Sequence, residues 1–110
     1  MNIRDVPFTA TDWSQVEPVK HKGKTGASFW RFFEQRNIRL RIVEYSAHFK
    51  SDHWCGRGHV LLILEGELII KLKDGRVITL TPGMSFQVSD DETNPHLACI
   101  ENRSKVFIVD

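Results

Sequence analysis

The residues best suited to chemistry in this chain are clustered in one segment, which reads Asp52-His53-Trp54-Cys55-Gly56-Arg57-Gly58-His59. His53 and Cys55 are one residue apart, so on an extended strand their side chains point to the same face. The two glycines beside Arg57 make a flexible turn that can bring His59 back to the same centre. Imidazole nitrogen and thiolate sulfur are ligands that zinc, iron, copper and nickel prefer. The spacing therefore predicts a transition-metal site.

A fourth ligand can come from His96, where a polar loop gives way to a short apolar run. A lone histidine on a strand is more often a hydrogen-bonded structural residue, but three ligand-type residues so close in sequence favour a metal. Cys55 has an ordinary alternative as well, because a free cysteine often behaves as a small buried hydrophobic residue. His48 is expected at the surface, and His21 falls in the N-terminal segment.

The elements that must position these residues are predicted to be strands. From residue 29 onward, short runs of aromatic and β-branched residues alternate with turn signals. Asp74-Gly75 lies between two alternating runs and predicts a type I′ hairpin. Gly66 interrupts the longest run and suggests a bend or bulge. About eight short strands without a helical period indicate an all-β sandwich or barrel.

Length and charge narrow the function further. A chain of 110 residues fits one domain, and we expect an irregular N-terminal segment over residues 1–28 that packs on a β-barrel over residues 29–110. A net charge of +1 gives no general electrostatic reason to expect a nucleic acid or a membrane as partner. No apolar run approaches the about 20 residues of a membrane span, and the first residues lack the apolar core of a signal peptide. Two cysteines suit free or metal-bound thiols in a reducing cytoplasm.

The apolar run over residues 60–64 bears on whether the protein forms a dimer. If His59 points inward, alternate residues of 60–64 point outward, and both faces of this strand are apolar. An apolar outer face in so small a domain needs a cover. A homodimer across this strand and packing of the N-terminal segment through Trp13 are the two open alternatives.

The metal-ligand segment resembles the first motif of the cupin family, H-x-H, three or four residues, Glu, six residues, Gly. Here it reads His53-x-Cys55, three residues, His59, six residues, Gly66, and His96 falls where the second cupin motif supplies a histidine. DHWC, with TPGMSFQV and the terminal VFIVD, resembles the small bacterial cupin-fold proteins named for a DHCW motif. The cupin resemblance covers residues 38–109.

This resemblance implies a single cupin-type double-stranded β-helix, a jelly-roll barrel with a divalent metal in its mouth, often dimeric. The chain departs from the family pattern in that Cys55 replaces the second histidine and His59 replaces the glutamate. The implied ligands are His53, Cys55, His59 and His96. A thiolate favours zinc, iron or nickel, while copper and manganese stay open. Four such ligands would make a closed zinc site, whereas three histidines alone would leave positions for O₂ or water.

Further residues are expected around the metal. Asp52 is placed to hydrogen-bond a ligand histidine. Arg39 and Arg41 share one strand face, which is either solvated or an anion clamp at the barrel mouth. Met84 and Phe86 are expected to line the barrel or its pocket.

The resemblance allows two main functions. The first is a metal-dependent enzyme, dioxygenase-like or isomerase-like, on a small polar molecule. The second is a non-catalytic cupin that binds or senses a metal or a small molecule, and a metal-free structural barrel remains a third reading. Open coordination would favour the enzyme, but beyond the ligands only Glu44 and Glu65 offer a general base, and only by position.

Overall fold

The computed structural model describes residues 2–110, and within them a short 3₁₀ helix, η1 (Trp13–Gln15), precedes nine strands. The strands are β1 (Val19–Lys22), β2 (Ala27–Gln35), β3 (Ile38–Tyr45), β4 (His59–Gly66), β5 (Leu68–Leu72), β6 (Val77–Leu80), β7 (Ser85–Val88), β8 (His96–Cys99) and β9 (Ser104–Val109). The predicted all-β fold is confirmed. Within the described residues, no helix has the length and apolar character needed to cross a membrane.

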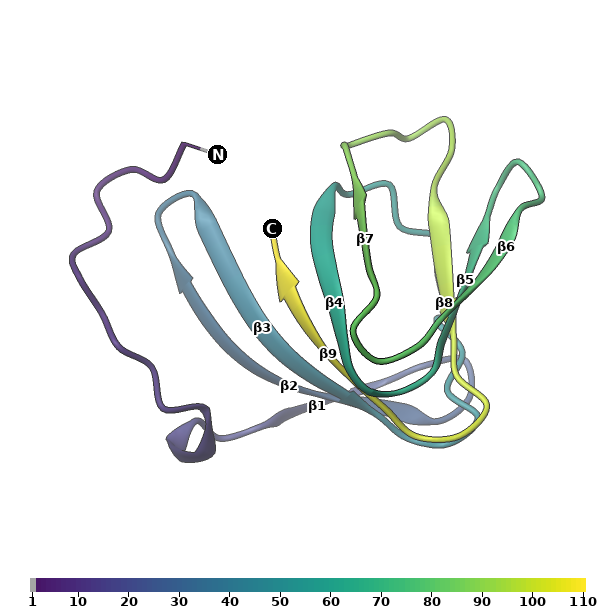
Figure 1. The fold of residues 1–110 in the computed structure, drawn as a ribbon, viewed down its shortest axis with the longest axis horizontal. Helices are drawn as coiled ribbons and strands as arrows, with labels where there is room; N and C mark the ends of the chain where they lie inside the picture. The colour runs from purple at the N-terminus through teal and green to yellow at the C-terminus, as the bar shows by residue number, and fades with distance from the viewer. Residues whose placement is uncertain (1) are drawn as a thin grey trace.

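The strands form two antiparallel sheets that face one another (Figure 1). The larger sheet has the order β1-β2-β3-β9-β4-β7, and the smaller one has the order β6-β5-β8. The long segment between β3 and β4 runs along the free edge of β8, where Lys50 bridges to Cys99 and Cys55 bridges to His96. This segment therefore extends the smaller sheet and carries Cys55 to it.

The core lies between the two sheets and follows the predicted alternation along β4. Leu61 and Ile63 are buried, whereas Val60, Leu62 and Leu64 are each more than a third exposed. The fully buried side chains at the centre come from β3, β4, β5 and β9: Val43, Ile63, Leu68 and Val106. The strand that begins at His59 thus has its inward face in the core, as the sequence predicted.

The N-terminal segment packs on the outer face of the larger sheet. Trp13 lies edge-on to Phe107, with ring centroids 6.5 Å apart. Arg31 Nε donates to the carbonyl of Val16 at 3.1 Å. The segment is less irregular than expected, because β1 pairs with β2 and β2 begins at Ala27. Strand pairing outweighs the weak strand propensity of the lysines and glycines here, while the domain division at residue 28 stays a prediction.

Two turns show where local prediction held and where it was wrong. The strand register shifts between Ile63 and Glu65, and Gly66 has φ +73°, in agreement with the predicted bulge. The hairpin at Asp74-Gly75 exists, since β5 pairs with β6. Its turn is not type I′, because only Gly75 has a positive φ, +101°. Gly75 N donates to the carbonyl of Leu72 at 3.0 Å, so a type I turn is followed by a left-handed glycine.

Candidate metal centre

Three of the predicted ligands converge in the structure. The ligand atoms of Cys55, His59 and His96 all lie within 4.8 Å of one another. The Nε2 atoms of His59 and His96 are 3.1 Å apart, and their rings are almost perpendicular, at 87°. Two imidazole nitrogens and a sulfur that point at one small volume are the donor set of zinc, iron and nickel sites.

Backbone pairing explains why Cys55 and His96 meet. Cys55 N donates to the carbonyl of His96 at 2.8 Å, and His96 N donates to the carbonyl of Cys55 at 2.9 Å. Residues that exchange both hydrogen bonds in an antiparallel pair lie directly opposite, with their side chains on the same face. His59 reaches the same place from the first position of β4. The ligands therefore come from both sides of the barrel.

The structure places His53 outside this cluster. The chain bends at residues 52 and 53, so the extended geometry that would put His53 and Cys55 on one face is missing. The His53 side chain is 75% exposed, and its Nδ1 lies 2.7 Å from Oδ1 of Asp52. Asp52 contacts His53, which is not one of the three converging residues, so the expected contact between Asp52 and a ligand histidine stays a prediction.

Asp110 is a site residue that the sequence reasoning missed. Its side chain is only 1% exposed. Arg39 donates two hydrogen bonds to the Asp110 carboxylate, from Nε to Oδ1 at 2.9 Å and from Nη2 to Oδ2 at 2.8 Å. Arg41 Nη2 donates to Oδ2 at 3.0 Å, and Arg57 Nε lies 3.4 Å from the same oxygen. Burial pushes the pKa of Asp110 upward, but the Arg39 hydrogen bonds and the three guanidinium charges outweigh it and hold the pKa below its ordinary value.

Strand pairing again sets this contact. Arg39 and Asp110 exchange backbone hydrogen bonds of 2.6 Å and 2.9 Å, so their side chains lie on one face. Arg39 and Arg41 also lie over the Trp30 ring, at 5.6 Å and 4.4 Å from its centroid. The face that they share is thus no solvated surface, since Arg41 is buried. The carboxylate that they hold belongs to the protein itself.

Burial favours the neutral form of both histidines. Burial, and then the charge of His96, lowers the pKa of His59 to about 4. Burial also lowers the pKa of His96. Among the described residues, His59 Nδ1 is buried without a hydrogen-bond partner, and Asp110 Oδ2 lies 3.8 Å away. The Nε2 atoms of the two rings are within hydrogen-bond distance of each other, so one of them carries a proton. Neutral imidazole is the form that binds metal, and a shift of that proton to Nδ1 would free both Nε2 atoms, so the residues fit a metal ion.

The cluster opens on a cavity of about 640 Å³ inside the barrel. Phe86 lies edge-on to both histidines, with centroid distances of 5.5 Å and 5.7 Å. Tyr45 lines the same cavity, and burial raises its pKa to about 12. Met84 does not reach this cavity, because it is exposed and its Sδ accepts from Thr81 Oγ1 at 3.3 Å. His21 lines the cavity from β1, although its sequence context gave no sign of it.

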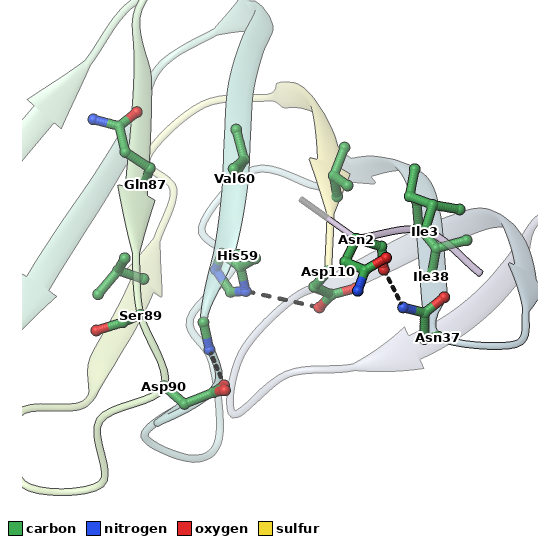
Figure 2. Close-up of a pocket in the computed structure, with 13 residues that line it drawn as sticks. Asn2, Ile3, Asn37, Ile38, His59, Val60, Gln87, Ser89, Asp90 and Asp110 are labelled. Atoms are coloured by element: carbon green, nitrogen blue, oxygen red, sulfur yellow. Dashed lines mark hydrogen bonds and ion pairs between the residues drawn. The ribbon is translucent and has the colours of Figure 1, made fainter.

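His59 and Asp110 also form part of the wall of a second cavity, of about 690 Å³ (Figure 2). The N-terminal residues close one side of it, where Asn37 Nδ2 donates to the carbonyl of Asn2 at 2.5 Å. Figure 2 shows His59 and Asp110 facing each other, with Asn2 and Ile3 on the far side of Asp110 from His59. His59 thus lies in the walls of both cavities.

Solved structures with the same architecture are numerous. A predicted oxalate decarboxylase from Thermotoga maritima matches with a TM-score of 0.75 at 13% identity, over 92% of this chain and 96% of that one. An RmlC-like cupin from Shewanella frigidimarina matches with a TM-score of 0.72 at 18% identity, over 90% and 86%. A sugar phosphate isomerase of the cupin superfamily from Silicibacter pomeroyi gives 0.73 at 13% identity, over 92% and 74%.

The chain has the cupin fold. The expected jelly-roll barrel is thereby confirmed, and identities this low show the fold alone. No family model matches the sequence, and no curated protein matches it either. The narrower resemblance to the DHCW-motif cupins stays a prediction.

Proposed function

We propose that this cupin-fold chain binds a divalent transition metal through Cys55, His59 and His96 and acts as a dioxygenase-like or isomerase-like enzyme on a small polar molecule. The observation that carries the proposal is the convergence of three ligand atoms within 4.8 Å at the wall of a 640 Å³ cavity. Three protein ligands leave coordination positions for water or substrate, as in catalytic metal sites. A metal bound there would supply Lewis-acid polarisation or an activated water.

The surrounding residues support this assignment. The Nε2 atoms of the two imidazoles point at each other across a 3.1 Å hydrogen bond, which a bound metal would replace. Phe86 packs against both rings and restricts their rotation. A sulfur ligand from Cys55 would favour zinc, iron or nickel, with copper and manganese as less favoured alternatives.

The second candidate is a non-catalytic cupin that binds or senses a metal or a small molecule. The positions of Glu44 and Glu65, the two predicted candidates for a general base, favour this alternative. Glu44 lies 3.5 Å from Arg31 and 3.9 Å from Lys105, and Glu65 is exposed. Neither residue lines the cavity. Proton transfer would therefore fall to another group or to a metal-bound water.

We further propose that the protein is a cytoplasmic homodimer. Its two cysteines are free thiols, which suits a reducing compartment. Val60, Leu62 and Leu64 leave an apolar strip on the outer face of β4, beside the Trp13–Phe107 contact. A second copy of the chain would cover that strip.

Elemental analysis of protein purified anaerobically without an affinity tag tests the metal site. We expect about one equivalent of transition metal per chain, lost in His59→Ala and in Cys55→Ser. His53→Ala is the matched control and keeps its metal, because that side chain lies outside the cluster. A wild-type protein that takes up no zinc, iron, nickel or copper after reconstitution would overturn the proposal. Metal loss in His53→Ala would instead support the predicted site with four ligands, in which His53 also binds the metal.

A second measurement separates the enzyme from the binding protein. In the cobalt-substituted protein, an open coordination position admits azide, which changes the visible cobalt spectrum. A centre saturated by protein ligands leaves that spectrum unchanged. The first outcome supports the enzyme, and the second supports the binding or sensing function.

A further inference from the structure

We infer that the small molecule in the barrel is an anion, a carboxylate or a phosphate, which Arg57 binds beside the three ligands. This inference rests on the proposed function, because it names the substrate class of the same site. Its basis is a surplus of positive charge at one place in the cavity wall. Arg39, Arg41 and Arg57 form ion pairs with a single carboxylate, Asp110, within the described residues. Asp52 and Glu92 also line the cavity, but the described residues show no ion pair between them and these arginines, so the positive charge at this place exceeds the carboxylate charge in contact with it.

Arg41 adds buried positive charge to the same cavity wall. Its side chain is 8% exposed, and its Nε is buried without a hydrogen-bond partner among the described residues. Burial, more than any nearby charge, lowers its pKa. Buried guanidinium groups are ordinarily paired and hydrogen-bonded. The Nε of Arg41 has almost no exposed surface, so Arg41 acts on a ligand in the cavity through its charge and not through direct contact.

Arg57 can receive the anion. Its side chain is 54% exposed, and its contact with Asp110 is the longest of the three arginine contacts, at 3.4 Å. It projects from the turn between Gly56 and Gly58, two residues from both Cys55 and His59. Asp110 keeps both Arg39 hydrogen bonds if Arg57 turns to an incoming anion. A planar guanidinium binds carboxylate or phosphate with two parallel hydrogen bonds.

The placement also fits the metal. Arg41 and Arg57 line the same cavity as Cys55, His59 and His96. An anion held at one end by Arg57 would present its other end to the three ligand atoms. The two sites would thus orient one molecule, which is what a positioning clamp does in catalysis.

Isothermal titration calorimetry with three probes tests the inference: malonate, inorganic phosphate and the neutral diamide malonamide. Each probe is titrated into metal-free and zinc-loaded protein. We expect one or both anions to bind in both forms, and malonamide to bind at least tenfold more weakly. Tighter binding of malonate identifies a carboxylate ligand, and tighter binding of phosphate identifies a phosphoryl ligand.

Arg57→Gln is expected to weaken anion binding at least tenfold, and Arg57→Lys to weaken it less. Arg76→Gln is the matched control, because Arg76 is exposed and pairs with Asp74 on the β5–β6 turn. Arg57 is exposed enough that its variants fold, whereas replacing buried Arg41 also removes a partner of Asp110. Equal anion binding by wild type and Arg57→Gln, or binding of malonamide as tight as malonate, would overturn the inference, as would no binding of either anion.

The two proposals fail separately in this design. Arg57-dependent anion binding by a protein that takes up no metal would leave the anion site standing without the metal centre. Zinc uptake without Arg57-dependent anion binding would leave the metal centre standing without the anion site.

Discussion

Asp110 and His59 face each other in the wall of the barrel cavity, with Asp110 Oδ2 3.8 Å from His59 Nδ1. When the Nε2 of a histidine binds a metal, its proton resides on Nδ1, and that N–H usually finds a carboxylate or a carbonyl. Asp110 is the carboxylate that faces Nδ1 here, and the 3.8 Å distance would have to shorten for that hydrogen bond to form. It is kept ionised by Arg39 and Arg41, which are fixed against Trp30.

Replacing Asp110 by asparagine should therefore weaken the metal centre without removing a ligand. Loss of such a partner typically costs about 10–100-fold in metal affinity. Competition with a chelator would measure the zinc affinity of Asp110→Asn, and the visible spectrum of the cobalt form would report any change at the ligands. Asp74→Asn, at an exposed turn, is the control. Unchanged zinc affinity in Asp110→Asn would remove Asp110 from the centre.

Truncating a core side chain on β5 should destabilise the fold. Leu68 is 0% exposed, so Leu68→Ala is expected to lower the free energy of unfolding by about 2–5 kcal/mol. Leu64 is 38% exposed on the outer face, and Leu64→Ala should cost far less. Urea unfolding followed by tryptophan fluorescence gives both values. Equal losses would mean that the outer strip is as well covered as the core.

Gly66 should not tolerate a side chain. Its φ is +73°, and an added Cβ would collide with the backbone carbonyl of Arg103. A non-glycine residue in the left-handed region costs about 1–2 kcal/mol before any steric clash. Gly75 has φ +101° but open space around it. Thermal unfolding should therefore show a larger loss for Gly66→Ala than for Gly75→Ala, and the reverse order would contradict the bulge geometry.

The single tyrosine gives a clean pH experiment. Burial raises the pKa of Tyr45 to about 12, against an ordinary value of about 10. The fold therefore favours the neutral phenol, and its contribution to stability is complete below about pH 10 and is lost as the pH rises toward 12. Absorbance of the tyrosinate in the folded protein would follow the titration. A midpoint near 10 would show that the hydroxyl is solvated.

The apolar strip on β4 makes the oligomeric state testable. If a second copy covers it, sedimentation velocity should give about twice the chain mass of 12.7 kDa. Leu62→Glu should then produce monomers, because it would bury a charge in the interface. Val77→Glu, on exposed β6, is the control. A monomeric wild type would indicate that Trp13 and the N-terminal segment cover enough of this face.

The sequence predicted the fold class and which face of β4 points into the core, because strand alternation is a local signal. His59, Leu61 and Ile63 point inward as expected, and the bulge at Gly66 follows from glycine itself. The position of His53 was not predictable in this way. Sharing a face with Cys55 requires an extended chain, but the chain bends at residues 52 and 53, where Ser51 Oγ donates to the carbonyl of His53 at 3.0 Å.

Asp110 was missed because its partner Arg39 is 71 residues away in sequence. One signal was present nonetheless. Val106 and Ile108 alternate inward along β9, and the same period extends to Asp110. A charged residue on the inward face of a core strand marks a site with a partner, and no single-sequence pattern names that partner.

The pairing of Cys55 with His96 has a consequence for how such a centre changes over time. Main-chain hydrogen bonds fix where these two side chains begin, and they do not depend on which side chains stand there. An exchange of cysteine for histidine or aspartate at position 55 would alter the hardness of the donor while leaving its location unchanged. The backbone of the barrel thus sets the position of a metal ligand, whereas the residue type sets its donor atom. A single substitution can therefore change which metal is preferred.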